Sequence, residues 1–250
     1  MNAPESKWFF IAEPRPSAKA RFFCFHYAGS NANVFSSWLS LIPEDIELVA
    51  VQLPGRGTRF GEDLHASMAP LMAGLLSDIP ALLDKPYFVF GHSLGAAVAC
   101  ELLFQLQHRN KPGPLHFFAS GRRSPSCEPL IPPLHDYPQE RFEQALRSFN
   151  GTPEQLFKEP ELMELFSPIL RADFKLSYDW QREPGVKLQC KASVLGGEED
   201  TLAPEHQLQA WQQHFEQTVD VKLFPGGHFF ITEHQNLLLP YLLKFLWVKP

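Results

Sequence analysis

A five-residue turn with a serine at its centre, Gly-His-Ser-Leu-Gly at residues 91–95, constrains this chain more than any other feature. An apolar, aromatic run at 86–90 precedes the turn and predicts a buried strand, and a run rich in alanine and leucine at 96–104 follows it and predicts a helix. A Gly-x-Ser-x-Gly between strand and helix is typical of a nucleophile elbow, which lifts the serine hydroxyl clear of a sheet. The alternative is an ordinary helix start with Ser93 as its N-cap. We take Ser93 as the candidate nucleophile and expect His92 to support the turn.

Strand-like and helix-like runs alternate on both sides of this turn. The further predicted strands lie at 21–27, 46–51, 115–120, 192–196 and 219–224. The further predicted helices lie at 33–41, 68–83, 204–214 and 236–246. Such alternation is typical of right-handed βαβ units, so the sequence predicts an α/β fold with a mostly parallel sheet flanked by helices.

The alternation is interrupted between Arg122 and Lys187, where no strand pattern is found. Proline-rich loops there lead into helical stretches at 138–149 and 161–178. A chain of 250 residues suits one domain. We therefore expect a single domain over residues 1–250 with a helical lid insertion at about 122–187. This lid would open and close the route to Ser93, shape a pocket and exclude water. The alternative is a segment that only adds packing at one edge of the sheet.

Composition excludes several classes of protein. A net charge of −6 argues against nucleic acid or an anionic membrane as a partner. The four cysteines form no Cys-x-x-Cys pair, so we expect no zinc, other metal or redox site, and Cys24 and Cys100 are predicted to be buried thiols. The polar start lacks the pattern of a signal peptide, and the longest apolar stretch, 237–248, is too short to span a bilayer. These observations favour a cytoplasmic protein, which we expect to be a monomer.

Two loops late in the chain carry the partners that a serine nucleophile needs. A serine hydroxyl requires a base, and the base requires an acid that orients it, in the chain order Ser, acid, His for this type of fold. The loop after the strand at 192–196 ends in Glu198, Glu199 and Asp200, and the loop after the next strand ends in Gly-Gly-His228. Both loops follow the carboxyl ends of parallel strands, where ligand chemistry gathers. We predict His228 as the base and Asp200 as the acid, with Glu198 and Glu199 as solvated turn charges.

Acyl transfer also needs hydrogen-bond donors for an oxyanion. One predicted donor is the backbone N–H of Leu94, the residue after the nucleophile. The second should come from the loop after the first predicted strand, His-Tyr-Ala-Gly-Ser-Asn at 26–31. A small residue followed by glycine lets the backbone approach a substrate, so we assign this donor to the N–H of Ala28. The alternative is an ordinary strand-to-helix turn.

Further motifs accompany the elbow over nearly the whole chain. They are Phe-His-Tyr-Ala-Gly-Ser at 25–30, Gln-Leu-Pro-Gly-Arg-Gly-Thr-Arg at 52–59, Leu-Arg-Ala-Asp-Phe at 170–174, Gly-Gly-Glu-Glu-Asp at 196–200 and Gly-Gly-His-Phe-Phe at 226–230. Together with the elbow they resemble the stand-alone type II thioesterases of nonribosomal peptide and polyketide synthesis, within the α/β-hydrolase fold. One departure is His26, where that family more often has proline.

The resemblance implies hydrolysis of acyl or aminoacyl thioesters on the phosphopantetheine arm of an acyl or peptidyl carrier protein. Ser93 would form an acyl-enzyme, with His228 as base and then acid, and no metal or dissociable cofactor would be needed because the substrate carries the phosphopantetheine. Alternatives are a medium-chain fatty acyl thioesterase and a carboxylesterase or lipase on free oxygen esters. A non-catalytic carrier-binding protein is a further alternative, against which the complete set of Ser93, Asp200 and His228 argues.

Two further groups of residues attract attention. Arg56 and Arg59 could contact an acidic carrier protein, but structural salt bridges are the interpretation that we favour. Leu170, Phe174 and Tyr178 recur at i, i+4 and i+8 in the insertion, which predicts one apolar stripe over the cleft as a substrate channel.

Overall fold

The computed structural model describes residues 6–149 and 151–246. The first five residues of the polar N-terminal segment and the end of the apolar stretch at 237–248 lie outside these ranges. None of the helices among the described residues is both long enough and apolar enough to cross a membrane.

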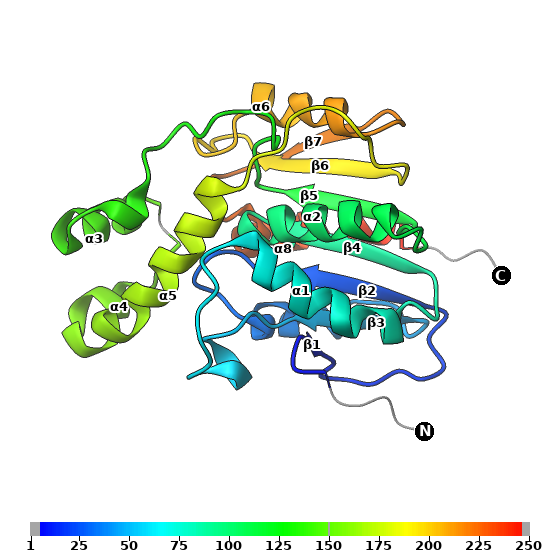
Figure 1. Ribbon diagram of the computed structural model, residues 1–250, viewed down its shortest axis with the longest axis horizontal. Helices are drawn as coiled ribbons and strands as arrows, with labels where there is room; N and C mark the ends of the chain where they lie inside the picture. The colour runs from blue at the N-terminus through cyan, green and yellow to red at the C-terminus, as the bar shows by residue number, and fades with distance from the viewer. Residues whose placement is uncertain (1–5, 150, 247–250) are drawn as a thin grey trace.

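A seven-stranded sheet forms the centre of the molecule (Figure 1), with the strand order β1-β3-β2-β4-β5-β6-β7. The strands are β1 (Phe9–Phe10), β2 (Ala20–Phe25), β3 (Ile46–Val51), β4 (Tyr87–His92), β5 (His116–Ser120), β6 (Ala192–Gly197) and β7 (Asp220–Phe224). Only β1 is antiparallel, to β3, and the other pairs are parallel. The predicted α/β fold with a mostly parallel sheet is therefore confirmed. Strand β1 was not predicted, because a two-residue strand has no periodicity to detect.

Helices cover both faces of this sheet (Figure 1). One face carries α1 (Met68–Asp78), α2 (Leu94–His108) and α6 (Glu205–Gln209), and the other carries the 3-10 helix η1 (Ala32–Trp38), α7 (Phe230–Glu233) and α8 (Gln235–Leu243). The helix predicted at 68–83 is divided, because α1 ends just before Pro80 and the 3-10 helix η3 (Ile79–Leu82) continues it. Proline has no N–H and its ring clashes with the preceding turn, which disfavours continuation of the α-helix here. The helix at 204–214 likewise continues from α6 into the 3-10 helix η5 (Ala210–His214).

The phenylalanine-rich strands fill the core on both faces of the sheet. Phe22 on β2 faces the layer that contains α8, and its ring lies 6.5 Å from that of Phe90 on β4 and 6.3 Å from that of Phe118 on β5. Phe23 and Phe117 point to the opposite face, toward α2. Strands buried on both faces read as continuous apolar runs, which is why these segments were recognisable. The packed sheet fixes the carboxyl ends of β4, β6 and β7 in one row.

The segment between β5 and β6 contains no strand among the described residues of 122–187. It holds the 3-10 helix η4 (Leu134–Asp136), α3 (Gln139–Ser148), α4 (Glu154–Lys158) and α5 (Pro160–Asp179), which we call the cap. The cap lies at the end of the molecule toward which the arrowheads of β5 and β6 point (Figure 1). Helices α3 and α5 lie within one or two residues of their predicted bounds. Helix α4 was not predicted, because its five residues are too few for a periodic pattern.

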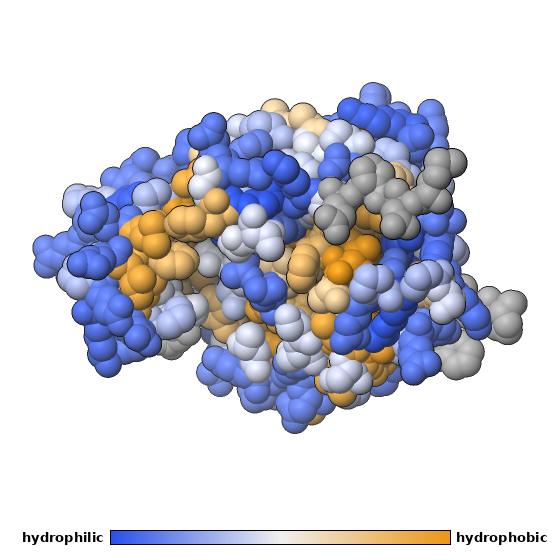
Figure 2. Space-filling model, turned by 90° about the horizontal axis from the view of Figure 1, so that it is seen from below, coloured by the Kyte–Doolittle hydropathy of each residue, from blue (hydrophilic) through white to orange (hydrophobic). Residues whose placement is uncertain are grey.

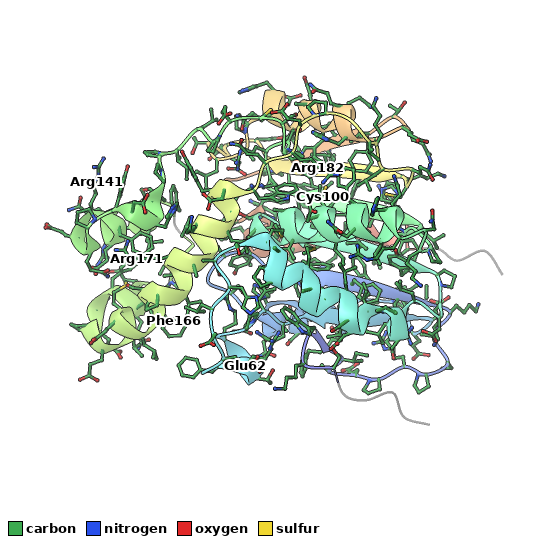
Figure 3. The ribbon with its side chains drawn as sticks, in the orientation of Figure 1. Glu62, Cys100, Arg141, Phe166, Arg171 and Arg182 are labelled. Atoms are coloured by element: carbon green, nitrogen blue, oxygen red, sulfur yellow. The ribbon has the colours of Figure 1, made fainter. Side chains whose placement is uncertain are left out.

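The cap has a small apolar core of its own. Leu134, Phe142, Leu146 and Leu170 are buried together there, apart from the two core clusters of the sheet. Seen from below, hydrophobic residues gather over this end of the molecule (Figure 2). Arg171 on α5 (Figure 3) links parts of the cap. Its guanidinium donates to the carbonyl of His135 (2.7 Å) and lies 4.2 Å from the Phe142 ring centroid. The segments on both sides of α3 therefore pack against α5.

Candidate active site

Ser93 occupies a strained backbone position between β4 and α2. Its φ of 55° and ψ of −114° lie where residues other than glycine are rarely found. A Cβ on Gly91 would lie 2.4 Å from the carbonyl oxygen of Gly95, and a Cβ on Gly95 would lie 2.1 Å from that of Phe25. The two glycines of the motif therefore let β4, α2 and the end of β2 come into backbone contact. The turn is held further by the Ser93 N–H, which donates to the Ser120 carbonyl on β5 (2.8 Å).

The structure brings Ser93, His228 and Asp200 into one hydrogen-bonded series. His228 Nε2 lies 2.9 Å from Ser93 Oγ, and His228 Nδ1 lies 2.8 Å from Asp200 Oδ2. The other carboxylate oxygen, Oδ1 of Asp200, accepts from the backbone N–H groups of Leu202 (2.9 Å) and Ala203 (3.3 Å). The Asp200 side chain is fully buried, so its charge acts on His228 with little screening by water.

The two other acids of the loop are arranged differently. Glu198 and Glu199 are exposed, and within the described part of the chain neither makes a hydrogen bond to His228. The turn after β6 carries them into solvent and returns inward only at Asp200. The geometry therefore favours Asp200 among the three candidate acids.

His92 lies behind the elbow rather than in the series. It is completely buried, and its Nδ1 lies 2.9 Å from Ser120 Oγ. Its ring centroid is 5.1 Å from that of His228. Burial, together with the nearby His228, holds the pKa of His92 well below its ordinary value, so the ring stays neutral. A neutral imidazole here fills the space beneath the turn without repelling a charge on His228.

The loop after β2 lies beside the start of α2, where the sequence analysis expected an oxyanion site. Contact between Gly95 and the carbonyl of Phe25 joins this loop to the elbow. The backbone N–H groups of Ala28 and Leu94 donate no hydrogen bond to any residue that the structure describes. Two free amide donors on adjoining segments are the arrangement that an oxyanion requires.

A pocket opens onto Ser93 and His228 beneath the cap. Phe174 and Tyr178 of the predicted stripe line it, together with Leu202. Leu170 is not among the lining residues and is buried in the cap core. Each step of four residues advances about 40° around a helix, so a stripe at i, i+4 and i+8 turns by about 80° along its length. This rotation points Leu170 away from the pocket that the next two residues of the stripe face.

Arg122 and Arg123 also line this pocket, and the sequence analysis did not assign them a place in the site. Arg122 donates through Nη1 to Ser177 Oγ (2.6 Å) and through Nη2 to the Ser177 carbonyl (2.6 Å). Arg123 Nε donates to the Cys127 carbonyl (3.0 Å). Burial, and then the charge of Arg123, lowers the pKa of Arg122. The sequence signal that could have placed them in the site is a pair of consecutive arginines two residues after the end of a predicted strand.

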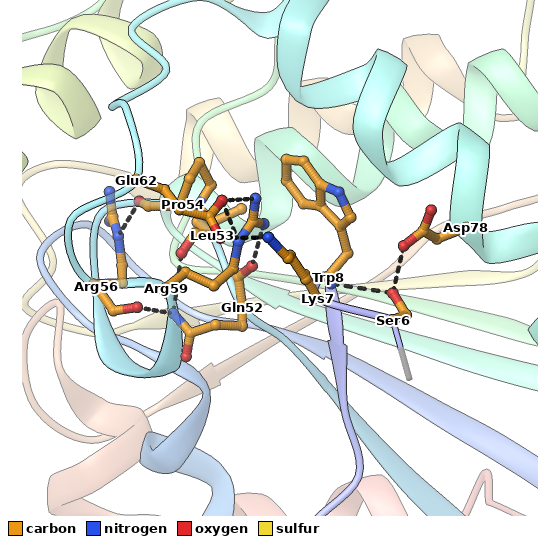
Figure 4. Close-up of polar contacts among 10 residues, drawn as sticks. All are labelled: Ser6, Lys7, Trp8, Gln52, Leu53, Pro54, Arg56, Arg59, Glu62 and Asp78. Atoms are coloured by element: carbon orange, nitrogen blue, oxygen red, sulfur yellow. Dashed lines mark hydrogen bonds and ion pairs between the residues drawn. The ribbon is translucent and has the colours of Figure 1, made fainter. Parts of the chain in front are cut away.

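Arg56 and Arg59 form structural ion pairs, as the favoured interpretation of their motif predicted, and of the two the Arg56 pair is buried on both sides. Arg59 Nη2 lies 2.7 Å from Glu62 Oε2, and its guanidinium is 4.0 Å from the Trp8 ring centroid (Figure 4). Arg56 Nη1 pairs with Asp173 on α5. Both arginine side chains are less than a tenth exposed, so neither is a free surface cation.

Comparisons with known proteins agree with this geometry. A family model described as a thioesterase domain matches residues 20–246. The chain is 33% identical over 239 residues to the gramicidin S biosynthesis protein GrsT of Aneurinibacillus migulanus, covering 96% of this chain and 93% of the relative. It is 30% identical to the medium-chain S-acyl fatty acid synthase thioesterase of Rattus norvegicus, covering 92% of this chain and 89% of that one.

Solved structures point the same way. YbtT, a type II thioesterase from the yersiniabactin nonribosomal peptide and polyketide pathway, superposes with a TM-score of 0.86 at 26% identity, covering 95% of this chain and 97% of YbtT. The sequence match and the structural match both cover nearly the whole chain. The chain therefore belongs to the thioesterase family of hydrolases, alongside the type II thioesterases of nonribosomal peptide and polyketide pathways.

Proposed function

We propose that this thioesterase hydrolyses acyl or aminoacyl thioesters on the phosphopantetheine arm of carrier proteins, with Ser93, His228 and Asp200 as its catalytic residues. The observation that carries the proposal is the hydrogen-bonded series from Ser93 Oγ through His228 to the buried Asp200. The carrier-bound substrate is supported by similarity to thioesterases of nonribosomal peptide and polyketide pathways.

Acylation follows from this geometry. Ser93 Oγ attacks the thioester carbonyl while His228 Nε2 takes its proton, and Asp200 stabilises the imidazolium through Nδ1–H. The free N–H groups of Ala28 and Leu94 bind the oxyanion of the tetrahedral intermediate. Collapse breaks the C–S bond, and His228 returns the proton to the leaving sulfur. The pantetheine thiol leaves and the acyl group stays on Ser93 as an ester.

Deacylation repeats these steps with water as the nucleophile. His228 takes a proton from a water molecule, which attacks the ester carbonyl under the same two amide donors. Breakdown releases the free acid and returns the proton to Ser93 Oγ. Phe174 and Tyr178 line the acyl pocket beneath the cap, which shields the ester from bulk water.

The proposal is tested with a panel of carrier proteins that are loaded with different acyl groups. Hydrolysis is followed by measuring the intact mass of each carrier protein. We expect loss of the acyl mass with the wild type and none with Ser93→Ala. A matched oxygen ester should react far more slowly than the thioester, and the reverse ranking would favour a carboxylesterase. A serine-directed fluorophosphonate probe should label the wild type, and failure to label would support a non-catalytic carrier-binding protein.

A medium-chain fatty acyl thioesterase is a second candidate. It is supported by the 30% identity to the rat enzyme and by the apolar side chains at the pocket walls. The same panel separates the two activities when it includes acyl groups of two to twelve carbons. A maximum at medium chain length, with little turnover of short acyl or aminoacyl groups, would favour the fatty acyl activity.

A further inference from the structure

Three of the motifs noted in the sequence meet beside the elbow. They are the His-Tyr-Ala-Gly loop after β2, the Pro-Gly-Arg loop after β3 and the Leu-Arg-Ala-Asp stretch of α5. Oδ2 of Asp173 accepts a hydrogen bond from the backbone N–H of Gly29 (2.8 Å) and pairs with Nη1 of Arg56. The side chains of Asp173 and Arg56 are 2% and 6% exposed. A buried carboxylate of the cap therefore binds the amide next to Ala28.

The Arg56 side of this contact is itself fixed. Arg56 Nε donates to the carbonyl of Pro54 (3.1 Å), and the Arg56 carbonyl accepts from Gln52 Nε2 (3.1 Å), as Figure 4 shows. The Oε1 atom of Gln52 in turn accepts from the N–H of Ala32 (3.2 Å). The guanidinium that holds Asp173 is therefore oriented before any substrate arrives.

The peptide group on the other side of Ala28 is also held. His26 Nδ1 lies 2.9 Å from the carbonyl oxygen of Tyr27, which also accepts from the N–H of Ser30 (3.2 Å). Burial, and then the charge of Arg56, lowers the pKa of His26 to about 4, so the ring is neutral at pH 7 and donates through Nδ1–H. The Tyr27 carbonyl and the Ala28 N–H belong to one planar peptide group, so fixing the first fixes the second.

We infer that Asp173 and His26 are positioning residues for the oxyanion hole, because they hold the two peptide groups that flank Ala28 and so aim its N–H at the developing oxyanion. This inference rests on the proposed function, in which Ala28 is an oxyanion donor. A hydrogen bond to a peptide carbonyl also polarises that peptide and strengthens its N–H as a donor. Proline at position 26 would lack the ring N–H that His26 supplies.

The test compares two double variants that both lack the buried charges. Arg56→Met with Asp173→Asn keeps an amide oxygen for the Gly29 N–H, whereas Arg56→Met with Asp173→Leu removes that acceptor. Removing both ionic partners avoids leaving a buried charge unpaired. We expect kcat of the leucine variant to be about tenfold or more below that of the asparagine variant, with KM unchanged, because loss of one oxyanion donor costs about 10²–10³ in kcat. The affinity of butylboronic acid, which forms a tetrahedral adduct with serine, should fall by a similar factor.

Equal kcat values and equal boronic acid affinities in the two double variants would overturn the inference. A second measurement covers the case in which the leucine variant does not fold. In the wild type labelled with ¹⁵N-glycine, the Gly29 amide proton should be protected from exchange and its chemical shift should move when the boronic acid adduct forms. An unprotected Gly29 amide, or one whose shift does not respond, would contradict the role of Asp173.

His26 is tested separately with His26→Phe, which keeps a ring of similar volume but has no donor. We expect kcat to fall about tenfold with little change in KM, and an unchanged kcat would remove His26 from the inference. Failure of the proposed function is recognised independently. It would appear as a wild type that hydrolyses no thioester, or as a Ser93→Ala variant that retains full activity.

Discussion

Replacing Asp200 by asparagine should disable the enzyme by switching His228 to the wrong tautomer. Oδ1 of Asp200 accepts from the N–H groups of Leu202 and Ala203, and Oδ2 faces His228 Nδ1 at 2.8 Å. An asparagine must keep its oxygen toward the two backbone donors, because its NH₂ group cannot accept from them. The NH₂ group then faces His228 Nδ1 and forces that nitrogen to act as an acceptor. The proton moves to Nε2, where it faces Ser93 Oγ and blocks removal of the serine proton.

The magnitude follows from losing both the tautomer and the charge. The same change in a serine protease with this arrangement lowers kcat by roughly 10⁴, which corresponds to about 5.4 kcal/mol of transition-state stabilisation. We expect a loss of this size because the Asp200 side chain is fully buried and no other described carboxylate bonds to His228. Folding should change little, because asparagine has the same shape and keeps the two backbone hydrogen bonds.

The assay is the release of free thiol from a butyryl-pantetheine thioester, measured beside a melting curve. Glu199→Gln is the matched control, because it removes a charge from the adjacent, exposed position of the same loop. It should retain activity within about threefold of the wild type, as surface charges contribute little. An Asp200→Asn variant within tenfold of the wild type, or a Glu199→Gln variant that is equally impaired, would refute the reasoning.

Three further outcomes are expected. Ser93→Ala should abolish hydrolysis with a small change in stability. The free energy of unfolding of Ser93→Gly should exceed that of Ser93→Ala by about 1 kcal/mol, because glycine relieves the strain at φ 55°. Equal free energies of unfolding in urea titrations of the two variants would contradict this. Phe174→Ser should shift the chain-length profile of turnover, since its ring lines the pocket; a large fall in melting temperature with an unchanged profile would assign the ring to cap packing alone. The free energy of unfolding should fall as the pH drops from about 6.5 to about 4, because burial lowers the pKa values of His26, His116 and His214 to about 4, whereas the unfolded chain binds these protons near 6.5; urea unfolding at pH 7 and pH 5 that gave equal values would refute it.

Most of the fold could be predicted from the sequence because its signals are local. The strand before Ser93 and the helix after it are contiguous runs with a diagnostic turn between them. The loops after the two late strands each carry a candidate residue, Asp200 three residues after β6 and His228 four residues after β7. Because the strands are parallel, their carboxyl ends must share one edge of the sheet. Together with the chain order Ser, acid, His for this type of fold, that rule placed His228 and Asp200 near Ser93 in the prediction.

The remaining features depend on contacts that no local pattern encodes. The hydrogen bond between Gly29 and Asp173 joins residues 144 positions apart, and the Arg56–Asp173 pair spans 117 positions. These residues lie in motifs that are visible in the sequence, but no local pattern shows that the motifs meet. The pocket position of Arg122 escaped notice for the same reason, because its guanidinium is placed by Ser177 on α5. The spacing on α5 predicts a stripe, but only the orientation of the helix shows that Phe174 lines the pocket and that Leu170 is buried in the cap core.

These contacts also restrict which part of the predicted lid can open and close. Moving α5 would separate Asp173 from Arg56 and Gly29, detach Ser177 from Arg122, and leave buried charges and an amide without partners. The segment with α3 and α4 packs on α5 and approaches the sheet domain at Gly151, where an added Cβ would lie 1.9 Å from Cζ of Phe229. Phe229 adjoins His228, so this contact lies next to the active site. If access to Ser93 is gated, we therefore expect α3 and α4 to move while α5 stays in place, because α5 also supports the loop that would bind the oxyanion.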